Sequence, residues 1–138
     1  MEKEVTALGL DKRVRFLGFV NQSQLPAVYT AADLMVLPSE YEPFAVVVNE
    51  ASCCRCAVIA SDRVGAAQDL VAPVEPRLIF PCGDVSALSA LLSDVCRERG
   101  RLRELGQAAK NRMAVWSPEH TVRGTMEAVE TAVRRRRR

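Results

Sequence analysis

The chain of 138 residues has few aromatic side chains and no long hydrophobic run. Aromatic residues make up only 5% of it, so we expect a core built mainly from Val, Leu and Ala. Its apolar runs, such as residues 34–38, are too short to span a bilayer. The residues after Met1 also lack the apolar segment of a signal peptide, which favours a cytoplasmic location.

The charge distribution excludes a broad basic surface for nucleic acid. The formal net charge is +2, but residues 134–138 are all arginine. Removing these five from the 19 basic residues leaves 14 against 17 acidic residues, a balance of −3. We therefore do not expect nucleic acid as a partner of the body. We interpret residues 134–138 as a solvated, disordered tail. The alternative is a tail that contacts nucleic acid, or anionic lipid at the cytosolic face of a membrane.

The five cysteines do not form a recognisable metal site. Their number is odd, and the C-C-x-C spacing of Cys53, Cys54 and Cys56 fits no zinc pattern. In a chain without a secretory signal, we interpret them as reduced thiols that fill small apolar spaces. No metal ligand is therefore predicted.

Four short segments are predicted strands. Residues 14–17 are rich in β-branched and aromatic side chains and end at Gly18. Residues 34–37 form a continuous apolar run, which is typical of a strand buried on both faces. Residues 57–61 and 77–80 are the other two predicted strands.

Six helices are predicted between and after these strands. They span residues 23–32, 45–54, 65–71, 84–99, 100–116 and 117–133. Pro26 and Pro43 lie where helices often begin. Asp84 and Ser117 are suitable N-caps. The segment 84–99 also repeats apolar residues with a helical period.

This alternation of strands and helices predicts an α/β fold. Short apolar strands separated by helices indicate a Rossmann-like parallel sheet of about four strands, with helices on both faces and three more helices at the carboxyl terminus. We assign residues 1–133 to one domain and residues 134–138 to a basic tail. Ligands bind such sheets beyond the carboxyl ends of the strands, which draws attention to the loops 38–45 and 61–66.

Each of these loops leads into a predicted helix. A helix start offers unpaired N–H groups and the positive end of a dipole, which together suit an anion such as phosphate. Residues 65–67 are Gly-Ala-Ala, small enough to let a ligand approach the backbone.

Two carboxylates belong to the same region. Glu42 lies in the first loop and Glu50 lies about one and a half turns into the helix 45–54. Carboxylates suit sugar hydroxyls and ribose diols, because both oxygens accept hydrogen bonds. The alternative is structural, with Glu42 solvated and Glu50 paired with Arg55.

Residues 8–133 resemble a known family. The stretches VRFLGFV, LPAVYTAADLMVLPSEYEPF, NEASCC and VIASDRVG are similar to the carboxyl-terminal, donor-binding half of the family 4 (group 1) retaining glycosyltransferases, which have the GT-B fold. Glu42 and Glu50 match the family's pair of glutamates separated by seven residues. The resemblance implies that Glu42 contacts the donor hexose near the reaction centre and that Glu50 binds the ribose hydroxyls.

The resemblance also implies the ligand and its backbone contacts. The donor substrate would be a nucleotide-diphosphate sugar, transferred with retention at the anomeric carbon and without an obligatory metal or other cofactor. The acceptor, whether glycan, lipid or small molecule, is not identified. Phe44, Ala45 and Val46 would offer backbone N–H groups to the sugar and the diphosphate. Gly18 and Phe19 would lie near the nucleotide base.

Four positions depart from the family pattern. Ala45, Arg55 and Ala66 replace glycines, and Ala57 replaces a proline. A Cβ at residue 45 narrows the approach to the backbone. Arg55 follows a predicted helix end, where a positive φ favours Gly, so Arg there costs about 1 kcal/mol. These changes predict weaker phosphate binding.

The family's donor domain opens with two further strands that carry a diphosphate-binding Arg and Lys, and an acceptor-binding domain precedes it. No residue of this chain matches these parts. We expect the chain alone to be inactive, because cations at the leaving group are usually a large catalytic contribution. Without those strands, residues 14–17 would pair directly with residues 34–37, leave a gap for a partner, or remain unpaired.

Two other functions remain open. A non-catalytic remnant could act as an interaction module through the basic tail or an open sheet edge. The second possible function is that of a different doubly wound protein that binds phosphate esters, such as an epimerase.

Overall fold

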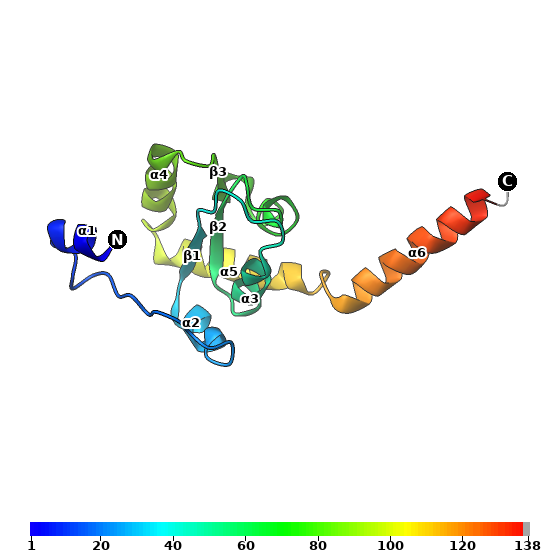
Figure 1. The fold of residues 1–138 in the computed structure, drawn as a ribbon, viewed down its shortest axis with the longest axis horizontal. Coiled ribbons are helices and arrows are strands. Elements are labelled where there is room, and N and C mark those ends of the chain that lie inside the picture. Colours follow the sequence, from blue (N-terminus) through cyan, green and yellow to red (C-terminus); the bar gives the residue numbers. More distant parts are fainter. Residues whose placement is uncertain (137–138) are drawn as a thin grey trace.

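A three-stranded parallel sheet lies at the centre of the computed structural model, which describes residues 1–136 (Figure 1). The strands β1 (Leu34–Leu37), β2 (Ala57–Ser61) and β3 (Ile79–Phe80) lie in the order β1-β2-β3. Leu34 pairs with Ala57, and Ala60 pairs with Ile79. The predicted α/β fold, with a parallel sheet and helices after it, is confirmed, although the sheet has three strands rather than about four.

Helices and helical turns connect and follow the strands. They are α1 (Glu2–Ala7), α2 (Leu25–Ala31), α3 (Val46–Cys53), a π-helical turn η1 (Ala67–Val71), a 3₁₀ turn η2 (Pro76–Leu78), α4 (Val85–Val95), α5 (Arg99–Met113) and α6 (Pro118–Arg136). Asp84 caps α4 as predicted, since its carboxylate accepts a hydrogen bond from the Ala87 N–H at 2.8 Å. The predicted helix 65–71 is only the short turn η1.

β2 and α3 form the centre of the core. Every residue of β2 is buried, and α3 buries Val48, Ala51 and Ser52. α5 packs against both elements. The approach of α5 is close, because a Cβ on Gly106 would lie 2.0 Å from the Arg55 carbonyl oxygen. The core consists mainly of aliphatic side chains, as the scarcity of aromatic residues implies.

Two predictions for the amino-terminal half are wrong. Residues 14–17 form no strand, and Phe16 and Leu17 are about half exposed. β-branched and aromatic residues favour a strand only where a neighbouring strand or a packed face receives them. β1 is half-buried rather than buried on both faces, because it is an edge strand that pairs only with β2 among the described residues. Of the three arrangements considered for residues 14–17, the structure has the unpaired one.

α6 extends away from the rest of the chain, at the end opposite α1 (Figure 1). None of its described residues is buried, and Val122, Met126, Val129 and Val133 form an exposed apolar stripe along it. The helix continues through residues 134–136, so this part of the predicted disordered tail is helical. The rest of that tail, residues 137–138, lies outside the described residues. No helix of residues 1–136 is both long and apolar enough to cross a membrane.

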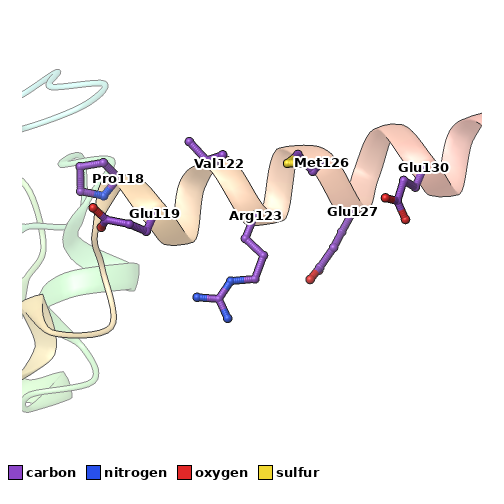
Figure 2. A pocket seen from close by; sticks show the side chains of 7 residues that line it. All are labelled: Pro118, Glu119, Val122, Arg123, Met126, Glu127 and Glu130. Carbon is purple, nitrogen blue, oxygen red and sulfur yellow. The ribbon is translucent and has the colours of Figure 1, made fainter.

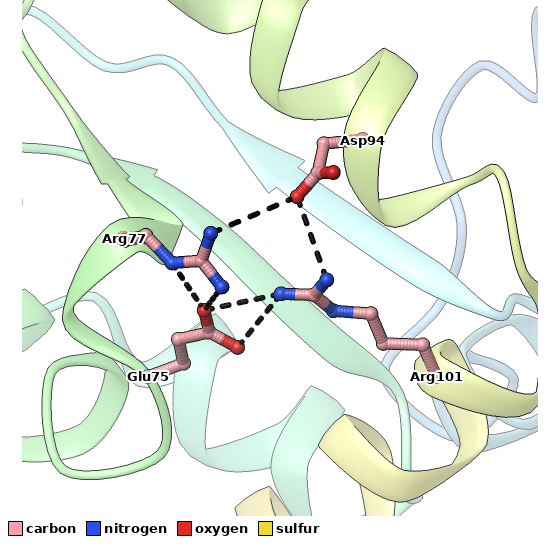
Figure 3. Close-up of polar contacts among 4 residues, drawn as sticks. All are labelled: Glu75, Arg77, Asp94 and Arg101. Atoms are coloured by element: carbon pink, nitrogen blue, oxygen red, sulfur yellow. Dashed lines mark hydrogen bonds and ion pairs between the residues drawn. The ribbon is translucent and has the colours of Figure 1, made fainter.

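Four charged side chains connect α4 and α5 to the turn before β3 (Figure 3). The carboxylate of Glu75 accepts hydrogen bonds from Arg77 and from Arg101, whose Nη2 reaches both oxygens at 3.1 and 3.2 Å. Asp94 lies 3.5 Å from Arg101 and 4.0 Å from Arg77. Because two cations and two anions neutralise one another, we assign this cluster to the fold rather than to ligand binding.

Candidate functional site

Backbone hydrogen bonds join the loops that follow β1 and β2. The Glu42 N–H donates to the Arg63 carbonyl at 3.3 Å, and the Gly65 N–H donates to the Glu42 carbonyl at 2.7 Å. The Ser61 hydroxyl donates to the Ser39 carbonyl at 2.6 Å. Parallel strands end at one edge of a sheet, so the two loops meet where the sequence predicted a binding region.

In the second loop, the space beside Gly65 is filled by the backbone of Pro43 and not left open to a ligand. A Cβ on Gly65 would lie 2.0 Å from the Pro43 carbonyl oxygen. The Ala67 N–H donates to the Val64 carbonyl at 3.0 Å, and η1 is a single turn. The second predicted helix start is therefore reduced to one short turn, and its first amide is already paired within the loop.

Glu42 lies at the amino-terminal end of α3. Its Oε1 accepts hydrogen bonds from the N–H groups of Ala45 at 3.0 Å and Phe44 at 3.3 Å. The carboxylate thus fixes the loop that leads into α3, while Ala45, the residue before Val46, provides no side-chain cap for the helix. Glu42 is therefore part-buried and hydrogen-bonded to its own loop rather than simply solvated.

Both ends of α3 adopt a left-handed backbone conformation. Ala45, just before the helix, has φ +53°, and Arg55, just after it, has φ +62°. The positive φ predicted for Arg55 is confirmed. At Ala45 the sequence argument missed it, since the replaced glycine was considered only as a way to admit a ligand. Each non-glycine residue in this conformation costs about 1 kcal/mol.

Glu50 is held by a residue of a different helix. The Tyr29 hydroxyl, on α2, donates to Glu50 Oε2 at 3.2 Å. Burial, followed by the charge and the hydrogen bond of Glu50, raises the pKa of Tyr29, so the phenol stays protonated at neutral pH. No ion pair joins Glu50 to Arg55 within residues 1–136, so that structural alternative is wrong. The sequence carries no signal for the Tyr29 contact, since the two residues are 21 positions apart.

Glu50 borders a cavity of about 390 Å³ between α2 and α3. The cavity is lined by Gln22, Leu25, Pro26, Tyr29, Asn49, Glu50, Cys53 and Cys54. Gly18 and Phe19 do not line it, and Phe19 is 95% exposed. The side chains of Phe44 and Val46 are also exposed, while Ala45 is buried. Of the candidates, only Glu50 lines the cavity. Glu42, Phe44, Ala45 and Val46 lie together at the start of α3, while Gly18 and Phe19 lie in the unpaired segment before α2.

Other parts of the described chain are less suited to a ligand. A hollow of about 500 Å³ runs along α6, but only residues of that helix line it, so it is an open groove (Figure 2). The Asp62 carboxylate accepts a hydrogen bond from the Cys82 N–H at 3.0 Å and joins the loops after β2 and β3. Within residues 1–136 no three His, Cys, Asp or Glu side chains gather as metal ligands would.

Comparison with protein families identifies the chain. The model of the family described as Glycosyl transferases group 1 matches residues 1–112. The chain belongs to the group 1 glycosyltransferases. This group 1 chain is 38% identical over 109 residues to 2-deoxystreptamine N-acetyl-D-glucosaminyltransferase of Streptomyces fradiae, over 79% of the chain and 26% of that protein. It is 32% identical over 127 residues to D-inositol 3-phosphate glycosyltransferase of Salinispora tropica, over 92% of the chain and 26% of that protein.

Two solved structures show the same fold as this group 1 chain. Sucrose-phosphate synthase from Thermosynechococcus elongatus superposes with a TM-score of 0.78 at 32% identity, covering 96% of the chain and 34% of that structure. The C-terminal domain of a group 1 glycosyltransferase from Francisella tularensis gives a TM-score of 0.73 at 25% identity, covering 83% and 58%. The chain thus has the Rossmann-like architecture of a GT-B domain, and it spans 26% of the length of the two curated relatives.

Proposed function

We propose that this chain binds a nucleotide-diphosphate sugar and forms the donor side of a retaining glycosyltransferase. The observation that carries the proposal is the placement of two carboxylates, one in the loop that leads into α3 and one within that helix. Glu42 accepts hydrogen bonds from the N–H groups of Phe44 and Ala45, just before the helix, and Glu50 borders the cavity between α2 and α3. Membership of the group 1 glycosyltransferases supports the assignment.

Glu50 is the proposed partner of the ribose. Its Oε2 accepts the Tyr29 hydroxyl, and no other hydrogen bond to its carboxylate is formed within the described part of the chain. Oε1 therefore remains free to accept hydrogen bonds from a vicinal diol. The cavity beside it, at about 390 Å³, falls in the range of small-molecule sites.

Glu42 and the start of α3 are the proposed partners of the sugar and the diphosphate. The backbone N–H groups of Phe44, Ala45 and Val46 would bind these groups, as helix starts bind phosphate. Two of these N–H groups are bonded to Glu42 in the free chain. An arriving phosphate repels that carboxylate, which would then turn toward the donor hexose near the reaction centre.

We assign binding of the nucleotide base and of the acceptor to parts of the protein outside α3. Gly18 and Phe19 would approach the nucleotide base if residues 11–20 close over the donor. A further amino-terminal domain, acting in cis, would bind the acceptor, which is a glycan, a lipid or a small molecule. We therefore expect this chain alone to bind the donor without transferring the sugar, and we assign no step to a metal ion.

Calorimetry with UDP-, GDP- and ADP-sugars at millimolar concentration tests donor binding. Glu50→Ala should weaken binding of the preferred donor about tenfold or more, because hydrogen bonds between a carboxylate and two hydroxyls are lost. Glu42→Ala should weaken it less, since its role is at the reacting sugar. Glu40→Ala, an exposed carboxylate of the same loop, is the control and should bind as the parent chain does. No heat with any donor would contradict the proposal.

A second candidate is an interaction module. The exposed stripe on α6 and the free edge of β1 favour it, because both present unpartnered surfaces in the described chain. Co-sedimentation with anionic vesicles, with and without residues 134–138, tests this candidate. Binding that depends on those arginines, in a chain that binds no nucleotide, would favour the interaction module over the donor domain.

A further inference from the structure

Tyr29 is the residue through which α2 reaches the candidate donor site. Its hydroxyl makes the one side-chain hydrogen bond that joins α2 to α3 within residues 1–136. Its ring packs against the edge of the hydrophobic core, and this packing restricts the position of the hydroxyl. Both Tyr29 and Glu50 line the same cavity.

The partner of Tyr29 is a side chain that needs orienting. Glu50 lies in the middle of α3, and its carboxylate can rotate about several single bonds. A ligand that binds a freely rotating carboxylate must supply the ordering free energy, whereas a carboxylate held in advance avoids that loss of affinity. A tyrosine hydroxyl suits this task, because its ring has few rotatable bonds and its O–H donates to one oxygen only.

We propose that Tyr29 is a positioning residue for the donor site. Its hydroxyl holds Glu50 Oε2, which turns Oε1 toward the cavity where the ribose diol of the nucleotide binds. This inference rests on the proposed function, since it assigns a support to the residue proposed to bind ribose. Tyr29 touches no reacting group in this account and acts only through Glu50.

A first experiment tests the contact without any ligand. The chain contains two tyrosines, so Tyr41→Phe leaves Tyr29 as the only phenol. An ultraviolet absorbance titration of this variant then reports the ionisation of Tyr29 alone. Adding Glu50→Gln should move that ionisation to lower pH, because the nearby negative charge and the hydrogen bond both favour the protonated phenol. An unchanged midpoint would overturn the contact. Circular dichroism over the same pH range checks that the fold persists.

A second experiment tests the positioning role by calorimetry. The probes are whichever of UDP, GDP or ADP binds the parent chain, and its 2′-deoxyribose counterpart. Tyr29→Phe keeps the ring and removes the hydroxyl, so it should weaken the ribonucleotide about tenfold and bring the two probes closer to equal affinity. Tyr41→Phe, which alters an exposed ring, is the matched control and should preserve both the affinity and the preference.

The outcomes separate the two proposals. Two results for Tyr29→Phe would show that the hydroxyl is merely structural. One is a loss of affinity that keeps the preference for ribose, and the other is a fall in the free energy of unfolding that accounts for the lost affinity. Parent-like affinity and preference in Tyr29→Phe would overturn the positioning role while leaving the donor site intact. If the parent chain binds no nucleotide although the titration shows the Tyr29 contact, the proposed function fails, and the positioning role fails with it.

Discussion

The helices α3 and α6 differ in what stabilises them, which is tertiary packing for α3 and local interactions within the helix for α6. α3 has eight residues, begins with three consecutive valines and has no side-chain N-cap of its own. α6 has 19 residues, and none of its described side chains is buried. Short helices rich in β-branched residues are weak by intrinsic propensity, whereas a helix of this greater length can persist on local interactions.

This difference indicates that tertiary packing, rather than intrinsic helix propensity, fixes the position of α3 and of the candidate site beside it. Val48 and Ala51 of α3 are completely buried, and α5 packs against the helix closely enough to require a glycine at position 106. This packing holds α3 between two residues with positive φ. α6 has no such support, so substitutions of the same type should act differently in the two helices.

The largest expected effect comes from a matched pair of valine truncations. Val48 is 0% exposed and Val129 is 58% exposed. Val48→Ala should lower the free energy of unfolding by about 2–3 kcal/mol, because two buried methyl groups are lost and a cavity remains. Val129→Ala should change it by less than about 0.5 kcal/mol, since alanine also favours the helix. Urea denaturation measures both, and equal losses would contradict the comparison.

Two helical glycines give the next contrast. Gly106→Ala should destabilise the chain by about 2 kcal/mol, because the new Cβ would meet the Arg55 carbonyl oxygen and force α5 away from α3. Gly124→Ala on α6 meets no atom within 4 Å and should favour helix by up to about 1 kcal/mol. Thermal unfolding followed by circular dichroism distinguishes the two. A stabilising Gly106→Ala would mean that the close approach of α5 is incorrect.

Replacing alanine by glycine should raise the stability of the chain at position 45, before α3, and lower helix stability at position 128, within α6. Ala45→Gly removes a left-handed strain and should stabilise the chain by about 0.5–1 kcal/mol, after the entropy of glycine in the unfolded chain is subtracted. Ala128→Gly, within α6, should reduce helix stability by about 1 kcal/mol. Chemical denaturation and helix content by circular dichroism provide the measurements. Destabilisation by Ala45→Gly would argue against the positive φ.

The smallest effect concerns thiol reactivity as a function of pH. Burial, followed by the charges of Cys54 and Asp33, raises the pKa of Cys56 to about 11. The thiolate is the reactive form, so Cys56 should resist alkylation until the pH approaches that value or the chain unfolds. Cys53, the last residue of α3, and Cys96 are both exposed and should react before Cys56. Mass spectrometry after brief alkylation at neutral pH reads out the sites, and early labelling of Cys56 would show that α3 opens readily.

The sequence was most informative where one physical pattern dominates. The apolar runs 34–37 and 57–61 are strands, and the loops after them meet because parallel strands end at one edge. The unpaired segment 14–17 could not be foreseen, because a strand depends on a neighbour as much as on its own residues.

The finer geometry of the site was also beyond the sequence. The Tyr29 contact and the hydrogen bonds from Phe44 and Ala45 to Glu42 depend on side-chain positions set by tertiary packing. Gly65 was correctly singled out as a place of close approach, but the backbone of Pro43 and not a ligand fills the space. The sequence predicted that Glu42 lies in the loop before α3 and Glu50 within the helix, and packing decided what the two side chains contact.

The most direct test of the donor-site account is an NMR titration of backbone amides with UDP-, GDP- and ADP-sugars. The account predicts that one donor shifts the amide signals of Phe44, Ala45 and Val46, because the phosphate replaces Glu42 as the partner of the first two and binds the third. It also predicts a shift at Glu50, and little change along α6. If no donor shifts the amides at the start of α3, or if the shifts are confined to α6, the central claim is contradicted.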